Sequence, residues 1–355
     1  MSGLNPQRAL RALYASYGYA PFKVRKFEDY DLYAENKRFL QSHRVLTFTD
    51  TDGRLKALKP DVTLSIVKNT TGAGVRKVFY QENVYREPRA GDGFCEIPQM
   101  GLECIGALTG YDVGEVVVLA ARSLAALSDS WVLSVSHIGV VSGVLEAAGL
   151  DEEQRRAAFS DVSRKNIPAI AALPDAETAA VLQSLLRLYG PLGETVAAAQ
   201  ALPLPEKSRL ALAELQTLSD QLALYGLDRV MLDLSVVNDV DYYDDIVFRG
   251  YVAGTASAAL SGGRYDRLLQ RMGKPGGALG FAVYLDRIEA PREANAFDGD
   301  ALVLFEAAQD LPAAVETAER LVAAGETVRV AMTEPEGLRF RRTLRIRNGE
   351  VLTDA

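Results

Sequence analysis

The sequence predicts an α+β protein built on an antiparallel sheet. Strand-like runs occupy the first hundred residues and return after residue 228, whereas the segment between them has helical spacing. The chain also lacks a G-x-x-x-x-G-K-[ST] motif, and Gly273-Lys274-Pro275-Gly276-Gly277 does not follow a strand as a phosphate loop should. Strands and helices therefore do not alternate as they would in a doubly wound nucleotide-binding fold.

The first elements can be placed from their local patterns. Residues 4–17 are typical of an amphipathic helix that ends at Gly18. Two strand-like runs within residues 44–67 flank a Thr-Asp-Gly turn, which predicts a hairpin. Further elements are expected at residues 75–87 and 94–105 (strands) and at residues 112–127 (a helix).

The middle of the chain, from about 130 to 225, predicts a helical insertion. It is rich in Ala, Leu, Glu and Gln at helical spacing and is interrupted by five prolines. Strands return at residues 229–237 and 246–253. The segment 261–288 then predicts a turn, a helix, a glycine loop, a strand and the start of another helix.

The last residues predict a separate small unit. From about residue 299 the pattern runs strand, helix, strand, and a final hairpin turns at Asn348-Gly349. We therefore divide the chain into a core, residues 1–298, which contains the helical insertion, and a C-terminal α/β unit, residues 299–355.

Composition excludes several classes of protein. The 355 residues carry 39 Lys and Arg against 47 Asp and Glu, so a general nucleic-acid footprint is not expected. Two cysteines and two histidines build neither a disulfide framework nor a Cys/His zinc cluster. The most apolar stretch, residues 113–127, is too short to span a bilayer, and no segment of signal-peptide type begins the chain. We expect a cytoplasmic protein without a membrane or metal site.

A polar pair on one strand is the first candidate site. Gln99, Gly101 and Glu103 alternate with Met100, Leu102 and Cys104, so the first three share the face opposite a core. A glycine between an amide and a carboxylate would leave a hole suited to a small ligand with an ammonium group. The alternative is a solvated strand face with a bulge.

Two other segments have similar double interpretations. Asp61 and Thr63 could hold an ammonium group, or Asp61 could cap the helix that follows. Tyr242 and Tyr243 offer flat walls with hydroxyl groups, or are half-buried aromatics at a strand start. The carboxylates around them, which belong to Asp239, Asp241, Asp244 and Asp245, lack a regular metal-ligand spacing and favour a solvated acidic loop.

The ordered set of segments KPDVT, VYRE, QMGLE, VDYY, GGRYD and GFAVYLDR resembles the histidyl-tRNA synthetases and their paralogues, the regulatory subunits of ATP phosphoribosyltransferase. The resemblance covers residues 1 to about 295. It implies a class II aminoacyl-tRNA synthetase-like fold, in which helices flank an antiparallel sheet and a helical insertion precedes the last strands. It also implies a histidine pocket formed by Asp61, Thr63, Arg86, Gln99, Glu103, Tyr242 and Tyr243. In that family the acidic and hydroxyl groups hold the amino group of histidine, and the arginine meets its carboxylate.

The departures from the synthetase pattern concern ATP. Asn238 and Asp239 stand where the family's R-G-L-D-Y-Y segment has an arginine and a glycine, and an arginine there stabilises charge on the α-phosphate. The loop from Arg86 to Phe94 is one residue short and lacks the later arginines of the synthetases. Tyr284 replaces a glycine, and its ring would crowd the adenine site, although Arg287 is kept.

The C-terminus departs as well, because synthetases carry an anticodon-binding domain of roughly a hundred residues and only about 55 follow residue 300 here. A set of arginines near the end is interpreted as one charged strand face, with a docking patch for an acidic partner as the alternative; its members are Arg339, Arg341, Arg342, Arg345 and Arg347.

The resemblance and its departures together favour the regulatory-subunit branch. They imply a subunit that is not catalytic alone, needs no cofactor and binds L-histidine as an allosteric feedback ligand. The expected partners are the short-form catalytic subunit, in a hetero-oligomer such as a hetero-octamer, and a second copy in a dimer, with no nucleic acid and no membrane. The alternatives are a divergent histidyl-tRNA synthetase and a synthetase-like enzyme for another amino acid, and both would require ATP.

Overall fold

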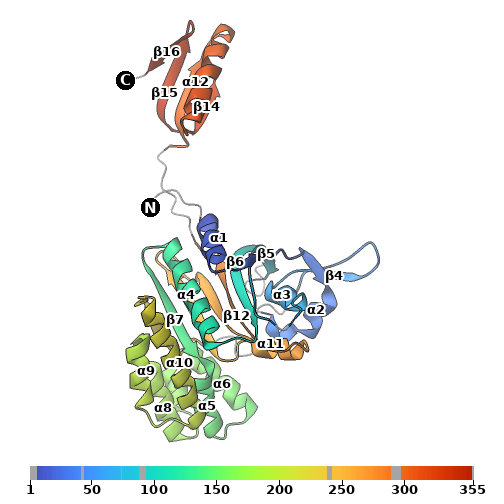
Figure 1. Cartoon of the computed structure of the whole chain (residues 1–355), viewed down its shortest axis with the longest axis vertical. Helices are drawn as coiled ribbons and strands as arrows, with labels where there is room; N and C mark the ends of the chain where they lie inside the picture. Colours follow the sequence, from blue (N-terminus) through green and yellow to red (C-terminus); the bar gives the residue numbers. More distant parts are fainter. Residues whose placement is uncertain are drawn as a thin grey trace. The chain divides into compact units, whose positions relative to one another are not determined.

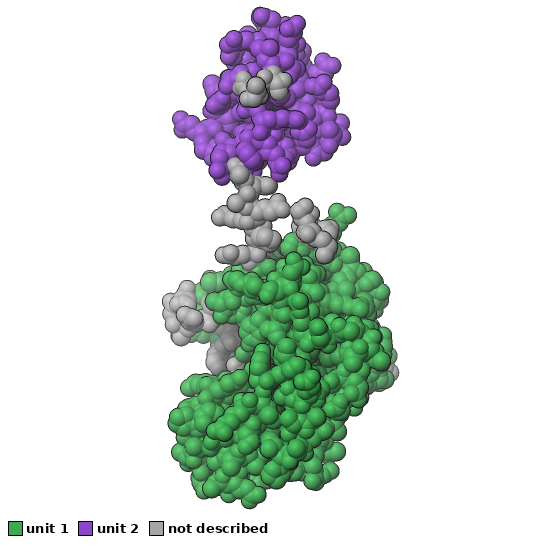
Figure 2. Space-filling model, turned by 90° about the vertical axis from the view of Figure 1, so that its left-hand side faces the viewer, with its two compact units in different colours: residues 1–289 green, residues 290–355 purple. Residues whose placement is uncertain are grey.

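The computed structural model describes residues 6–40, 44–72, 74–87, 93–237, 242–288 and 297–353. The chain divides into two compact units, residues 1–289 and 290–355, which Figure 2 shows in separate colours. This division falls nine residues before the boundary expected from the sequence. Each unit is described by itself below.

A nine-stranded sheet, counted over the described residues, is the centre of the first unit (Figure 1). Neighbouring strands are antiparallel except for two parallel pairs, β1 with β5 and β7 with β9. In spatial order the strands are β1 (Ala20–Pro21), β5 (Arg76–Arg86), β6 (Cys95–Gly106), β12 (Gly277–Tyr284), β11 (Leu260–Arg264), β10 (Ile246–Val252), β7 (Trp131–His137), β9 (Val230–Asp233) and β8 (Tyr189–Pro191).

One face of this sheet is covered by the larger hydrophobic core. Helix α4 (Gly110–Leu127) crosses the strands there, and its start is fixed by a capping box between Thr109 and Asp112. The helical insertion gathers at the β7 end of the sheet in Figure 1. Its helices are α5 (Ile138–Ala147), α6 (Glu152–Ser163), α7 (Ile167–Ala171), α8 (Ala176–Arg187), α9 (Leu192–Gln200) and α10 (Glu206–Leu224). Helix α1 (Pro6–Ser16) joins the same core through Leu10 and Tyr14.

The other face carries a second core and the polar pocket described below. Short helices pack there: α2 (Tyr30–Glu35), the 3₁₀ turn η1 (Lys37–Phe39), α3 (Thr63–Lys68) and α11 (Asp266–Arg271). A three-stranded sheet, β2 (Phe27–Asp29), β4 (Leu55–Leu58) and β3 (Thr47–Thr49), contains the hairpin expected from the Thr-Asp-Gly turn. Gly53 in that turn has φ +82°, which a side chain would disfavour.

Three expectations from the sequence are wrong in detail. The helical insertion begins at residue 138, because Trp131–His137 form β7 in the middle of the sheet. Residues 261–264 lie in β11 rather than in a turn. Residues 285–288 form a turn where the start of a helix was expected.

The glycines explain the second of these errors. A Cβ on Gly262 would lie 2.5 Å from the Phe281 Cβ, and one on Gly263 would lie 2.6 Å from the Tyr243 ring. These glycines permit neighbouring groups to approach the backbone closely within a sheet. In the sequence, a Gly-Gly pair with this role looks the same as a Gly-Gly pair in a turn.

The second unit is a small four-stranded sheet with one helix among its described residues. Its parts are β14 (Val328–Ala331), β13 (Gly299–Phe305), β15 (Phe340–Arg347), β16 (Glu350–Thr353), α12 (Leu311–Ala323) and the 3₁₀ turn η2 (Ala308–Asp310). Asn348 and Gly349 have φ of 50° and 76°, the left-handed pair of a tight hairpin turn, as the sequence predicts.

Candidate functional site

A polar cavity lies on the sheet face opposite the larger core, where β6, β12 and β11 run side by side. Its empty volume is about 360 Å³, including the part open to solvent. All seven residues singled out in the sequence line it: Asp61, Thr63, Arg86, Gln99, Glu103, Tyr242 and Tyr243. The structure therefore brings together segments that are up to 182 residues apart in the chain.

Strand β6 supplies two of these residues by simple alternation. Met100, Leu102 and Cys104 are fully buried in the larger core, as predicted, and Gln99 and Glu103 point to the opposite face. The hole expected beside Gly101 is, however, filled by Tyr80, its partner on β5. A Cβ at residue 101 would lie 2.6 Å from the Tyr80 hydroxyl oxygen, so the glycine makes room for the chain's own ring.

Glu103 is the most deeply buried acid of the cavity, with 2% of its surface exposed. Its Oε1 accepts a hydrogen bond from Thr63 Oγ1 at 2.7 Å, and its Oε2 accepts one from the Tyr265 hydroxyl at 2.5 Å. Burial raises the pKa of Glu103 to about 8, although both hydrogen bonds favour the ionised form. Among the described residues Glu103 forms no ion pair, and a ligand with a positive group would favour its ionised form.

Asp61 makes the contact at the start of α3 that one of the two sequence interpretations expects. Its Oδ1 accepts the backbone N–H of Leu64 at 2.9 Å in the first turn of α3, which confirms the capping interpretation. Its Oδ2 lies 3.7 Å from the Arg86 guanidinium. Burial raises the pKa of Asp61, and Arg86 opposes that shift. Arg86 is itself oriented, because its Nε donates to the Pro60 carbonyl at 2.5 Å.

Gln99 contributes a buried hydrogen-bond donor that has no acceptor among the described residues. The residue is 2% exposed, and its Nε2 has no hydrogen-bond partner within the described part of the chain. A buried polar group without a partner costs roughly 1–3 kcal/mol. An oxygen or unprotonated ring nitrogen of a ligand would remove that cost.

Aromatic rings form the walls of the cavity. The rings of Tyr242 and Tyr243 meet edge to face with centroids 4.7 Å apart, and Tyr265 lies 5.8 Å from Tyr242. Burial raises the pKa of Tyr242 and of Tyr265 well above the usual value, so both hydroxyls stay protonated and can donate.

Four hydroxyl-bearing residues of the cavity were not assigned to the histidine pocket from the sequence: Tyr80, Ser261, Tyr265 and Tyr284. Tyr265 could have been found from the sequence, because it lies in the GGRYD segment. Tyr80 could not, because its pairing with the glycine of QMGLE depends on the strand register. From the sequence we expect the ring of Tyr284 to crowd an adenine site. Its hydroxyl lies 2.7 Å from Ser261 Oγ, and the Arg287 guanidinium lies 3.9 Å from its ring centroid.

Some of the residues singled out in the sequence lie outside the described residues, and others form ion pairs. Asn238, Asp239 and Asp241, and the loop residues 88–92, lie outside the described residues. Four of the five arginines singled out near the C-terminus form ion pairs: Arg341 with Asp300, Arg342 with Glu326, Arg345 with Glu334 and Arg347 with Glu306. Arg341, Arg345 and Arg347 share one face of β15, whereas Arg342 alternates to the face of Leu344 and Ile346.

The described residues contain no group of three or more His, Cys, Asp or Glu arranged to hold a metal ion. None of the helices among them is long and apolar enough to cross a membrane.

An antiparallel sheet, a helical insertion and a polar pocket on one sheet face define a class II aminoacyl-tRNA synthetase-like protein. The sequence matches the histidyl-tRNA synthetase family over residues 5–288, and the chain belongs to that family.

Within it, sequence relatives include two ATP phosphoribosyltransferase regulatory subunits. That of Clostridium kluyveri is 28% identical over 81% of this chain and 78% of the relative. That of Clostridium acetobutylicum is 25% identical over 92% of this chain and 85% of the relative.

Solved structures agree with this placement. A Bacillus halodurans protein described as an ATP phosphoribosyltransferase regulatory subunit/histidyl-tRNA synthetase is similar at a TM-score of 0.75 and 27% identity, over 92% of this chain and 87% of that one. A chain of the ATP phosphoribosyl transferase (HisG:HisZ) complex from Thermotoga maritima shares the fold at a TM-score of 0.62 and 17% identity, over 80% of this chain and 98% of that one.

Proposed function

We propose that this protein is a non-catalytic regulatory subunit of ATP phosphoribosyltransferase that binds L-histidine in the cavity around Glu103. It would associate with the short-form catalytic subunit in a cytoplasmic hetero-oligomer, support the first step of histidine biosynthesis and carry feedback inhibition. The observation that supports this most is the assembly of all seven expected residues in one buried polar cavity. The catalytic subunit is proposed as the partner from the descriptions of the relatives.

The cavity offers complementary groups for each polar part of histidine. Glu103 and Asp61 provide negative charge for a cationic group, and Arg86 provides positive charge for a carboxylate. Gln99 has a donor without a partner among the described residues, and the tyrosine rings provide flat walls. No cofactor is needed for binding, because each polar part of the ligand meets a side chain of this chain.

Two features support binding without adenylation. In a synthetase the amino-acid carboxylate must attack ATP, and a guanidinium face near the pocket is a natural surface for the adenine ring. Here the Tyr284 ring lies against the guanidinium of Arg287, which also donates to the Ala258 carbonyl at 2.7 Å. The departures at Asn238 and in the loop after Arg86 point the same way.

Regulation would follow from linkage between two ligands of one complex. Histidine lowers activity only if it binds the less active state of the complex more tightly, and the ratio of its two affinities sets the extent of inhibition.

The test is phosphoribosyl-ATP formation by the purified short-form catalytic chain from the same source, with and without this protein, followed by a titration with histidine. We expect activity to rise on mixing and to fall with histidine. No change on mixing would contradict the proposal. Histidine-dependent ATP–pyrophosphate exchange by this protein alone would instead support the divergent histidyl-tRNA synthetase.

A further inference from the structure

The two tyrosines that wall the cavity depend on a short stretch of backbone for their position. Tyr242 and Tyr243 precede β10 by only two residues, Asp244 and Asp245, and each is 7% exposed. The Asp244 N–H donates to the Arg264 carbonyl at 2.8 Å, and the Asp245 carbonyl accepts from Ile138 at 2.9 Å. These two bonds fix Asp244 and Asp245, which directly follow Tyr243 and form the end of the stretch nearer the sheet.

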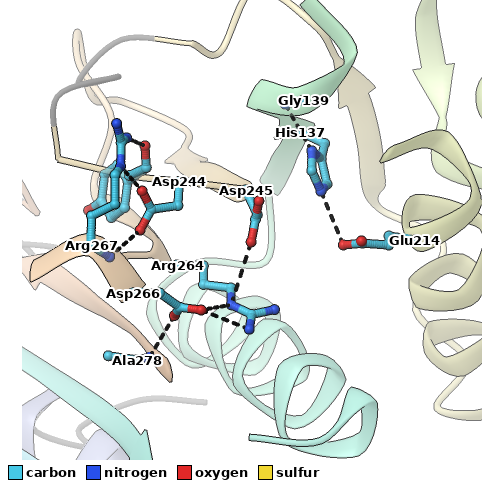
Figure 3. A network of polar contacts seen from close by, with 10 residues as sticks. His137, Gly139, Glu214, Asp244, Asp245, Arg264, Asp266, Arg267 and Ala278 are labelled. Atoms are coloured by element: carbon cyan, nitrogen blue, oxygen red, sulfur yellow. Dashed lines mark hydrogen bonds and ion pairs between the residues drawn. The ribbon is translucent and has the colours of Figure 1, made fainter. Parts of the chain in front are cut away.

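Arg267 makes three further contacts to this stretch. Its backbone N–H donates to Asp244 Oδ2 at 2.7 Å, and its guanidinium forms an ion pair with the same carboxylate. The guanidinium also donates to the Tyr243 carbonyl at 2.7 Å. Figure 3 shows Arg267 directed at Asp244, away from the Arg264 pair with Asp266. One side chain thus holds both the carbonyl of a cavity tyrosine and the residue that follows it.

The helix that carries Arg267 is itself anchored at its start. Tyr265 precedes α11, and its hydroxyl donates to Glu103 inside the cavity. Asp266 Oδ1 accepts the N–H of Ala278 at 2.8 Å, which ties the first turn of α11 to β12. Arg267 therefore extends from a fixed point beside the cavity to the tyrosine wall.

Arg267 lies outside the cavity and touches no position that a ligand there could occupy. Its side chain is 52% exposed, so its removal leaves no hole in either core. A loss of ligand affinity on its removal would therefore reflect the position of the wall rather than a collapsed core.

We propose that Arg267 is a positioning residue of the histidine pocket, which holds Tyr242 and Tyr243 in their ligand-binding arrangement before the ligand arrives. This inference rests on the proposed function, since it assumes that histidine is the ligand. A wall held in advance removes the entropy loss that ordering it on binding would otherwise impose. The bond to the Tyr243 carbonyl adds to the restraint from the Asp244 N–H, because both groups belong to the same planar peptide.

The experiment compares the full-length wild type with Arg267→Ala, Arg267→Lys and the control Arg271→Ala. Arg271 is on the same short helix, and its guanidinium donates to the Glu35 carbonyl, away from the tyrosine stretch. Isothermal titration with L-histidine should give roughly tenfold weaker binding for Arg267→Ala, about the loss of one to two hydrogen bonds at a charged group. Arg267→Lys should fall between, because an ammonium keeps the Asp244 pair and loses the second contact. Arg271→Ala should match the wild type.

Hydrogen exchange provides a readout that does not depend on affinity. In the ligand-free Arg267→Ala variant, amides of residues 242–248 should exchange at least several-fold faster than in the wild type, and saturating histidine should restore their protection. Equal histidine affinity in Arg267→Ala and the wild type, or equal exchange of that peptide, would overturn the inference while leaving the proposed function intact. A wild type that fails to bind histidine would overturn both.

Discussion

Glu103→Gln tests the central electrostatic claim about the cavity. The wild-type carboxyl has a pKa of about 8 in the folded protein against an ordinary value of 4.5. Between these two pH values the folded state retains a proton that the unfolded state releases, so stability decreases as pH rises through this window. Glutamine has no proton to release, keeps nearly the same shape and leaves the neighbours in place.

The magnitude follows from the size of the window. A difference of about 3.5 units between the two pKa values corresponds to a limit of roughly 4–5 kcal/mol at 1.36 kcal/mol per unit. At pH 5 this effect destabilises the wild type by less than about 1 kcal/mol. The free energy of unfolding of Glu103→Gln minus that of the wild type should therefore grow by roughly 3 kcal/mol from pH 5 to pH 8. Any constant effect of the new amide on the bonds from Thr63 and Tyr265 cancels in this comparison of slopes.

Urea unfolding followed by tryptophan fluorescence measures this difference in the full chain. The sole tryptophan, Trp131, is in β7 of the first unit, so its signal reports the unit that contains Glu103. Parallel stability curves for the wild type and Glu103→Gln between pH 5 and pH 8 would refute the reasoning, because they would show that Glu103 ionises in the fold as easily as in water.

Four further outcomes are expected. Histidine affinity of the wild type should rise several-fold from pH 6 to pH 7.5, because a cationic ligand group favours ionised Glu103; calorimetry of Glu103→Gln should show a weaker affinity and a smaller rise. Gln99→Leu should stabilise the free protein by about 1 kcal/mol, because it removes an unpaired buried donor, while it weakens histidine binding in the same titration. Gly280→Ala should abolish histidine binding, because its Cβ would collide with Glu103 Oε2; unchanged affinity would show that the carboxylate is free to move. Gly349→Ala, with φ of 76° at that position, should destabilise the last hairpin by about 1 kcal/mol and speed hydrogen exchange in β15 and β16 only.

Much of the site could be predicted because strand alternation and the family resemblance are independent of helix boundaries. Gln99 and Glu103 follow from a period of two along a single strand, and the structure places both at the cavity. What alternation could not show is the neighbour across the sheet. Tyr80 fills the space beside Gly101 because β5 pairs with β6 in a register that brings these residues opposite each other, and register depends on the whole hairpin.

The errors in the fold have a similar cause. Residues 131–137 directly precede the helical segment and were grouped with it, although they contain none of its Ala, Glu or Gln, and they pair with β10 and β9 as strand β7. Gly262 and Gly263 were assigned to a turn because glycine pairs are frequent in turns, whereas here they permit contact with Phe281 and Tyr243. Both cases depend on neighbours that are distant in sequence.

The parallel pairing of β7 and β9 has a consequence for the origin of the helical insertion. The chain leaves β7 at His137 and enters β9 at Val230, which lies beside Leu133, so the two ends are at opposite ends of the paired strands. Between them the chain returns to the sheet once, as the short edge strand β8. A replacement for residues 138–229 would have to travel back along four residues of β7, about 13 Å at 3.3 Å per residue, before it could enter β9. A tight turn would reverse the direction of β9 and break the parallel pairing. The insertion is thus a crossover connection rather than an enlarged hairpin loop, and any ancestor without these helices already needed a connection of this length.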